Sequence, residues 1–297
     1  MAAIVAGLRR RTDQPLETIY SDLASNNFNQ LFSNLDEARR AGLFAANVYP
    51  GAFGGSFYGP LLPPDTVHLA TCFNAIHWLD RLPAVPLRDG FAYRRPLPTR
   101  TGLAMSPPEV AAAFTRQAEQ DLVRFLECRA RELVPGAKLL LAGPGDSDQA
   151  RVFDGLYEVL KDACLDLVAA GLMEREGYER FAMPCYFRTV VELLAPLERD
   201  GSPVRGAFAV DRADTLEFPT PFLEEFRRGG DVATYAEAYT GFLRAVSEPV
   251  VRAALNQPEG EDGPVECLYE RIHARLVAEP ERYSSHFILV AALLTRR

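Results

Sequence analysis

Two neighbouring ring donors, His77 and Trp78, are the side chains whose types and order most directly indicate chemistry. The indole N–H of Trp78 can only donate, and the imidazole of His77 donates from one or the other nitrogen, depending on its tautomer. Such a pair suits a small anion. Ser56 and Phe57 lie earlier, in a glycine-rich loop whose backbone can approach a ligand closely, and they offer a hydroxyl and a flat face. The alternative for this stretch is a glycine-rich turn followed by the start of a core helix.

Asp22 stands at the end of a strand predicted for residues 16–21. In nucleotide-binding α/β folds, an acidic residue at the end of the second strand accepts hydrogen bonds from the ribose hydroxyls. Aspartate is also a preferred helix N-cap, and a helix could begin here. The residue type alone leaves both roles open.

The elements that must position these side chains alternate between strand and helix. Residues 46–80 are predicted to form strand, loop, strand, loop, because short apolar or β-branched runs alternate with Gly- and Pro-rich segments. In an open α/β sheet such loops lie at the carboxyl ends of the strands, where ligands bind. Periodicity and breakers predict the other elements: helices at 2–11, 109–133, within 147–200, within 221–256 and at 264–279, strands at 138–142, 207–210 and 287–294, and irregular segments at 83–108 and 257–263.

The bulk properties favour an ordinary globular protein. The 297 residues are 48% hydrophobic and 24% charged, and the net charge of -8 argues against a nucleic-acid-binding surface. The five cysteines lack CxxC spacing, which predicts buried thiols in a reducing compartment. No run approaches the roughly 18 apolar residues of a membrane span. We therefore expect a cytoplasmic protein without membrane or nucleic-acid partners, with homodimerisation left open.

Five segments together form a specific pattern: residues 21–29 (SDLASNNFN), 49–51 (YPG), 55–59 (GSFYG), 67–69 (VHL) and 76–79 (IHWL). This pattern resembles the signature of the SABATH methyltransferases, which use S-adenosylmethionine to methylate small carboxylic acids such as salicylate, benzoate and jasmonate. Some members methylate xanthine nitrogens instead. The resemblance covers essentially the whole chain from Leu16 onward.

The resemblance implies an α/β fold: a Rossmann-like class I methyltransferase sheet with an α-helical cap. Nothing before Leu16 is similar to the family's first strand and its glycine-rich turn, which wraps the methionine end of the cofactor, so we expect the first strand to be absent. The implied organisation is a core at 1–145, a mainly helical cap or substrate region at 146–263, and a final helix and strand at 264–297 that complete the core sheet.

The resemblance also assigns roles to the residues that bind the cofactor, S-adenosyl-L-methionine. By position, Asp22 and Leu23 match the pair that holds its ribose and adenine. Ser56 and Phe57 match residues that contact the adenine. These roles agree with the chemistry of an acidic strand end and of a glycine-rich loop with a flat side chain.

A second set of residues matches positions around the acid substrate. His77 and Trp78 would fix one carboxylate oxygen, and Asn74 stands where plant relatives often have Tyr. Tyr157 and Tyr186 match substrate-facing aromatics, although both could equally be core residues whose hydroxyls reach a partner. Phe287 is a further pocket residue on the same grounds.

A metal site is not expected. Some relatives bind magnesium through residues that correspond here to Arg88, Glu179 and Ala182, and hard divalent cations require several oxygen ligands.

The predicted reaction is methyl transfer to the carboxylate of a small organic acid. A carboxylic acid with a pKa of about 4 is already ionised at neutral pH, so no general base is required. The alternatives are an N-methyltransferase of a heterocycle, for which His77 is the obvious base, and a non-catalytic homologue that lacks a complete cofactor site and acts as a binding partner.

Overall fold

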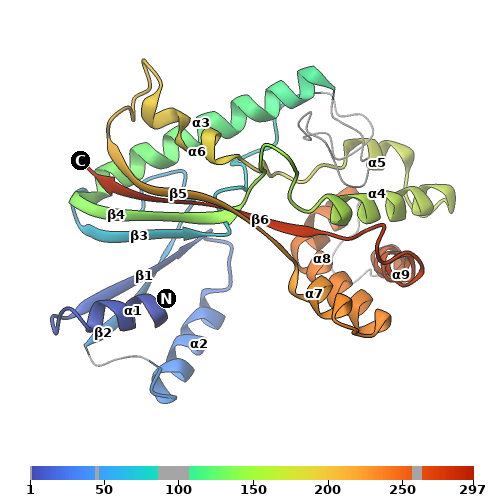
Figure 1. The fold of residues 1–297 in the computed structure, drawn as a ribbon, viewed down its shortest axis with the longest axis horizontal. Helices are drawn as coiled ribbons and strands as arrows, with labels where there is room; N and C mark the ends of the chain where they lie inside the picture. The colour runs from blue at the N-terminus through green and yellow to red at the C-terminus, as the bar shows by residue number, and fades with distance from the viewer. Residues whose placement is uncertain (1, 44–46, 86–106, 256–262) are drawn as a thin grey trace.

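The computed structural model describes residues 2–43, 47–85, 107–255 and 263–297, and every structural statement refers to these residues (Figure 1). Most of the irregular segment predicted at 83–108, and nearly all of the polar break predicted at 257–263, lie outside them.

Four strands form the main sheet, in the spatial order β3 (Val67–Phe73), β4 (Leu133–Pro144), β6 (His286–Arg296) and β5 (Phe208–Pro219). β3 and β4 are parallel, whereas β6 is antiparallel to both β4 and β5. Alternate side chains of β6, from Ile288 to Leu294, are buried, as expected for successive residues on opposite faces of a strand. The predicted final strand is confirmed, and it completes the sheet by lying between β4 and β5.

The other two strands form a separate sheet. β1 (Leu16–Asp22) pairs in parallel with β2 (Val48–Gly54), and among the described residues neither strand pairs with β3. In the doubly wound order 3-2-1-4-5-6, the first strand lies between the second and the fourth. With β1, β2 and β3 as the second, third and fourth strands, the break falls at the place of the first strand. The resemblance predicted this strand to be absent, but the sequence did not show that the sheet divides in two there.

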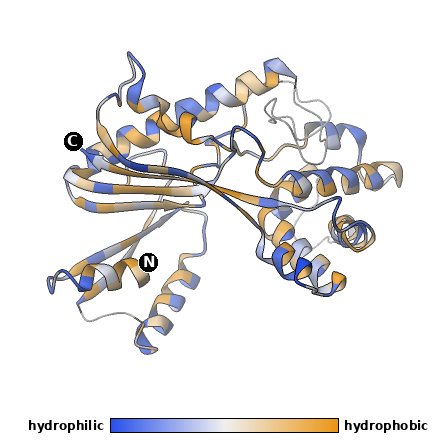
Figure 2. Cartoon of the chain, viewed as in Figure 1, coloured by the Kyte–Doolittle hydropathy of each residue, from blue (hydrophilic) through white to orange (hydrophobic). Residues whose placement is uncertain are grey.

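Helices α3 (Pro108–Glu132) and α6 (Val190–Glu198) lie together along the main sheet (Figure 1). Pro108 favours the start of α3, where a missing N–H costs nothing, and the apolar residues Val110, Phe114, Leu122 and Phe125 form its buried face. The helices show hydrophobic and hydrophilic residues on different sides (Figure 2). α1 (Ala2–Arg9) and α2 (Phe28–Arg40) lie beside the β1–β2 sheet (Figure 1).

In the described parts of the chain, five further helices form a cap beyond the end of the main sheet at which β3 and β4 finish (Figure 1). They are α4 (Asp154–Ala169), α5 (Arg175–Arg180), α7 (Pro221–Arg227), α8 (Val232–Ala254) and α9 (Gly263–Ala278). Gly171, at φ +71°, follows α4 in the left-handed conformation in which glycine commonly ends a helix. The boundaries of the three predicted domains stay a prediction; β5 belongs to the sheet although it falls in the range predicted as mainly helical.

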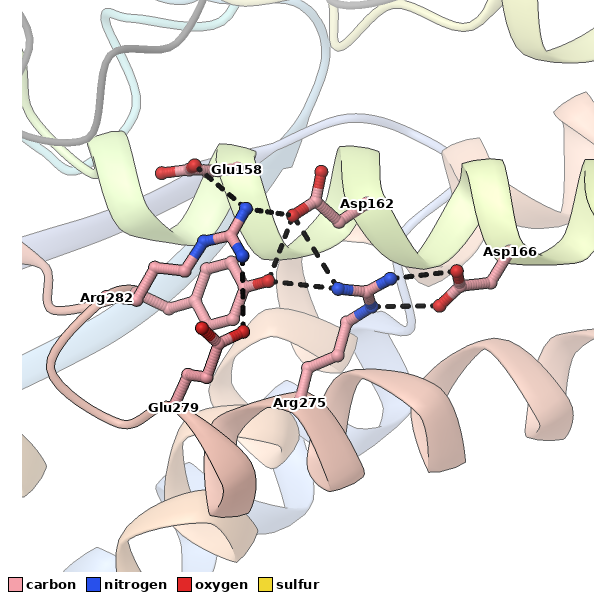
Figure 3. Close-up of polar contacts among 7 residues, drawn as sticks. Glu158, Asp162, Asp166, Arg275, Glu279 and Arg282 are labelled. Carbon is pink, nitrogen blue, oxygen red and sulfur yellow. Dashed lines mark hydrogen bonds and ion pairs between the residues drawn. The ribbon is translucent and has the colours of Figure 1, made fainter.

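An ion-pair network fastens α4 to α9 and to the segment after α9 (Figure 3). Arg275 of α9 donates two hydrogen bonds of 2.8 Å to the carboxylate of Asp166 in α4. Asp162 accepts from Arg282 at 3.1 Å and from the hydroxyl of Tyr283 at 2.9 Å. Bidentate pairs of this kind hold both distance and orientation, so the network fixes the start of β6 relative to the cap.

Candidate functional site

The carboxylate of Asp22 organises the turn after β1. Its Oδ1 accepts a hydrogen bond from the backbone N–H of Leu23 at 2.7 Å, and its Oδ2 accepts one from the side-chain amide of Asn26 at 2.6 Å. The N-cap of α2 is Asn27, so the alternative role of Asp22 as a helix cap is wrong. A carboxylate has about four acceptor sites. Both oxygens of Asp22 therefore keep the capacity to accept ribose hydroxyls, and Leu23 beside it is 54% exposed.

The glycine-rich loop that carries Ser56 and Phe57 lies directly against this turn. The N–H of Gly55 donates to the carbonyl of Asp22 at 2.8 Å. A Cβ on Gly54 would lie 3.4 Å from the backbone of Ala24, which shows how closely the two loops approach. The four residues predicted to bind the cofactor are therefore neighbours in space.

A buried ion pair on α3 clamps the continuation of this loop. Arg129 donates to the carbonyls of Phe57 and Gly59 at 3.0 Å each, and to both carboxylate oxygens of Glu132 at 2.9 and 2.8 Å. Glu132 in turn accepts from the N–H of Leu61 at 2.7 Å. Both charged side chains are buried. The clamp fixes the backbone of the loop, and sequence patterns gave no signal for it.

Tyr58 joins the glycine-rich loop to the segment of the two ring donors. Its ring is buried, and its hydroxyl donates to the backbone carbonyl of Trp78. The predicted cofactor wall and the predicted acid-binding wall are thus connected by residues 55–58: Gly55 binds the Asp22 carbonyl, and Tyr58 binds the Trp78 carbonyl.

His77 is a neutral side chain in this structure. It is buried, and burial, reinforced by the positive charge of Arg188, lowers its pKa to about 3. Its Nδ1 atom is buried and has no hydrogen-bond partner among the described residues. A cavity of about 10 Å³, room for about one water molecule, is lined by His77, Tyr186 and Arg188 together with six other residues.

Aromatic rings from distant parts of the chain meet next to the ring donors. His77 lies 5.1 Å from Trp78 and 5.6 Å from Phe187, measured between ring centroids. The ring centroid of Phe187 lies 6.2 Å from that of Tyr157 and 6.1 Å from that of Phe153. The ring of Phe287 lies 5.3 Å from that of Phe153. Four of the predicted substrate residues (His77, Trp78, Tyr157 and Phe287) therefore belong to one aromatic cluster.

Phe153 and Phe187 link this cluster, and neither was predicted as a site residue. Phe153 has φ +58°, an uncommon backbone conformation for a bulky side chain. Such outliers are costly and concentrate at functional sites.

The hydroxyls of the two predicted tyrosines have partners within the protein. That of Tyr157 is 3.2 Å from Sγ of Cys185. That of Tyr186 donates to Glu192 at 2.8 Å and lies 3.1 Å from Oγ1 of Thr115. Both rings are buried, which favours the core interpretation for the hydroxyls, while their role toward a substrate stays a prediction.

Asn74 lies at the end of β3 and is exposed. Its N–H donates to the carbonyl of Ala142 at 2.9 Å, and its φ of +50° is one that Asn tolerates better than most residues. The backbone places it two residues before Ile76, at the entrance to the segment of the ring donors.

The described parts of the chain hold no cluster of three His, Cys, Asp or Glu side chains that could bind a metal ion. Glu179 lies in α5 and Ala182 just after it, whereas Arg88 lies outside the described residues. The same parts contain no helix with the length and hydrophobicity that a membrane crossing requires.

Known proteins resemble this chain in fold and in sequence. A solved structure of loganic acid methyltransferase with SAH superposes with a TM-score of 0.75 at 22% identity, over 99% of this chain and 78% of that one, which places the fold in the class I methyltransferase architecture. Gibberellic acid methyltransferase 2 of Arabidopsis thaliana is 31% identical over 253 residues, and caffeine synthase 1 of Camellia crassicolumna is 30% identical over 250. Each of these two alignments covers 80% of this chain and 62% of the relative, so the chain spans about three fifths of the length of these relatives.

The family itself is defined by a model described as SAM dependent carboxyl methyltransferase, which matches residues 4–297. The chain belongs to this family. The resemblance predicted from the motifs between residues 21 and 79 is confirmed.

Proposed function

We propose that this protein transfers the methyl group of S-adenosylmethionine to the carboxylate of a small organic acid. The observation that carries the proposal is the short connection between the two predicted walls: residues 55–58 hydrogen-bond Asp22 at one end and Trp78 at the other. A site of this construction can hold a methyl donor and an acceptor side by side. Methyl transfer requires such alignment, which contributes several kcal/mol when the reacting atoms are held about 3 Å apart.

The residues of the first wall fit the adenosine half of the cofactor. Asp22 has spare acceptor capacity for the ribose hydroxyls, Leu23 offers exposed apolar surface, and Ser56 and Phe57 lie in the adjoining loop. When bound, the cofactor supplies a sulfonium methyl: the C–S bond breaks with its electron pair going to sulfur, and an O–CH₃ ester bond forms on the acid.

The second wall fits a carboxylate rather than a general base. His77 stays neutral at physiological pH because its pKa lies at about 3, so it can donate one N–H beside the indole N–H of Trp78. Two donors can hold one oxygen of the acid while the other faces the methyl group. The rings of Tyr157, Tyr186 and Phe287 would line the organic part of the acid, and Asn74 would contact any additional polar group.

N-methylation of a heterocycle is the second candidate, because caffeine synthase 1 is among the relatives. His77 was the obvious base for it. A general base works best with a pKa near the operating pH, and a pKa of about 3 makes His77 a poor one. The chemistry of the site therefore favours the carboxylate.

Calorimetry with S-adenosylmethionine separates both enzymatic proposals from a non-catalytic binding partner. Micromolar affinity supports an enzyme, and no binding at millimolar concentration supports the partner role.

The direct test of the acid-binding wall is Trp78→Ala, assayed with methyl-labelled S-adenosylmethionine and a panel of small acids. We expect methyl transfer to be abolished while cofactor binding survives. Phe32→Ala, at an exposed aromatic of α2, is the matched control and should leave transfer unchanged. Unchanged turnover in Trp78→Ala would mean that the carboxylate anchor is misassigned.

The cellular setting is also a proposal. The five cysteines, of which two are buried, are all free thiols, which agrees with a reducing compartment such as the cytoplasm. Homodimerisation and the lack of membrane or nucleic-acid partners remain predictions, which light scattering and binding assays can check.

A further inference from the structure

Arg188 is a buried cation in contact with the backbone of the segment of the two ring donors. It precedes α6 and is 5% exposed. Its Nη1 donates to the carbonyl of Ile76 at 2.6 Å, and its Nη2 donates to the carbonyl of Ala118 in α3. The guanidinium thus bridges α3 and the residue immediately before His77.

This bridge is one of three hydrogen bonds that hold successive carbonyls of the segment. Ile76 is held by Arg188, His77 by the N–H of Tyr186 at 2.8 Å, and Trp78 by the hydroxyl of Tyr58. The three donors are a guanidinium, a backbone N–H and a phenolic hydroxyl. Because all three carbonyls are bonded, the backbone that carries the two rings is held in place.

The charge of Arg188 is not neutralised by a direct ion pair with any described residue. Its guanidinium hydrogen-bonds neutral carbonyls, and burial lowers its pKa. Glu192 and Asp121 are the carboxylates that act on it electrostatically. Each is engaged elsewhere: Glu192 with the hydroxyl of Tyr186, and Asp121 with Arg124.

Bridging two backbone carbonyls does not by itself require a charged side chain. Burying a charge is costly, and well-packed apolar residues often replace buried charges without loss of stability. A buried cation that lines a cavity and has no described carboxylate in direct contact does, however, contribute a positive potential, which a bound anion experiences in a medium of low dielectric constant. Such a charge lowers the free energy of an ionised ligand relative to a neutral one of the same shape.

We propose that Arg188 is a positioning and specificity-determining residue. It fixes the His77–Trp78 segment through the Ile76 carbonyl, and its charge makes the site select an ionised carboxylate over a neutral molecule of the same shape. The inference deepens the proposed function and depends on the acid binding at this segment. It also accounts for the preference for an acid over a neutral heterocycle.

The test compares benzoate with benzamide, which have nearly the same shape but differ in charge at neutral pH. Their affinities are measured by calorimetry on the full chain with saturating S-adenosylhomocysteine, in the wild type, Arg188→Met and Arg188→Lys. Arg116→Met, at an exposed position of α3, is the control for removal of a surface charge. Thermal unfolding and S-adenosylhomocysteine affinity verify that each variant is folded.

We expect benzoate to bind more tightly than benzamide in the wild type. In Arg188→Met the ratio of the two affinities should fall roughly tenfold, which corresponds to ~1.4 kcal/mol. Arg188→Lys keeps the charge, so it should keep the ratio within about threefold while turnover falls, because an ammonium lacks the fork geometry of the guanidinium. Arg116→Met should match the wild type.

Equal losses of benzoate and benzamide affinity in Arg188→Met would overturn the specificity role and leave only a structural one. If Arg188→Met does not fold, a tenfold loss of the benzoate-to-benzamide affinity ratio in folded Arg188→Lys would overturn the specificity role as well. Equal affinities for benzoate and benzamide in the wild type would also overturn it. The two proposals can fail separately: an Arg188-dependent ratio without methyl transfer refutes the proposed function, whereas methyl transfer with an Arg188-independent ratio refutes this inference.

Discussion

Removing one oxygen atom from Tyr58 should disconnect the two walls of the site. In Tyr58→Phe the ring remains and the hydroxyl that donates to the Trp78 carbonyl is lost. The Tyr58 ring is 7% exposed, so water cannot readily replace the lost donor. The phenylalanine keeps the packing against Phe57, whose ring centroid lies 4.4 Å away.

The expected cost follows from the group that is left behind. A buried carbonyl without its donor costs about 1–3 kcal/mol, and the lost apolar area is negligible. This cost should appear in the free energy of unfolding. Catalysis should suffer further, because Trp78 loses the bond that fixes its backbone and small displacements of reacting groups can cost on the order of 100-fold in rate.

Urea unfolding, S-adenosylhomocysteine calorimetry and methyl-transfer kinetics measure the three consequences. We expect a loss of stability of about 1–3 kcal/mol, cofactor affinity changed by less than about threefold, and a turnover lowered by at least about tenfold. Tyr49→Phe, at a tyrosine that is 57% exposed, is the matched control and should behave as the wild type. A Tyr58→Phe protein with wild-type stability and turnover would refute the reasoning.

Two further predictions concern buried titratable side chains. The pKa of His77 is about 3 in the folded protein, against about 6.5 in an unfolded chain. As the pH falls below about 6.5, the unfolded chain binds a proton that the folded protein does not, so His77 should lower the free energy of unfolding by up to about 1.4 kcal/mol per pH unit down to pH 4. Urea unfolding of His77→Asn should lack this contribution, whereas the exposed-site variant His68→Asn should retain it; parallel curves for His77→Asn and wild type would contradict the assignment. Arg129→Met leaves the carboxylate of Glu132 buried without its partner, so it should cost about 3–5 kcal/mol of stability and weaken S-adenosylhomocysteine binding, while Arg131→Met, at an exposed neighbouring position, should do neither; an Arg129→Met protein as stable as wild type would exclude the clamp.

The sequence predicted most elements because their signals are local. Helical periodicity placed α3 within a residue of its observed bounds, and the apolar run near the C-terminus marked β6. The strands β4 and β5 are longer than predicted, because pairing with other strands extends them: β5 pairs with β6 as far as Pro219, and β4 begins at Leu133, which pairs with Val67 of β3.

The candidate site was predictable only where a motif carried it. The motifs identified Asp22, Ser56 and Trp78, but no pattern indicated that the segment between them would form the connection through Tyr58. Arg188 directly follows an apolar run (FAMPCYF, residues 181–187), which was the one available signal that a charge is buried there. The division of the strands into two sheets depends on pairing across the whole chain, which periodicity along one segment cannot reveal.

A crystal structure of the full chain with S-adenosylhomocysteine and benzoate would test the central claim most directly. The account predicts ribose hydroxyls within hydrogen-bond distance of the Asp22 carboxylate. It also predicts one benzoate oxygen on the indole N–H of Trp78 and the other facing the cofactor sulfur, with room for a single methyl group between them. Benzoate bound away from Trp78, or a ribose that does not contact Asp22, would contradict it.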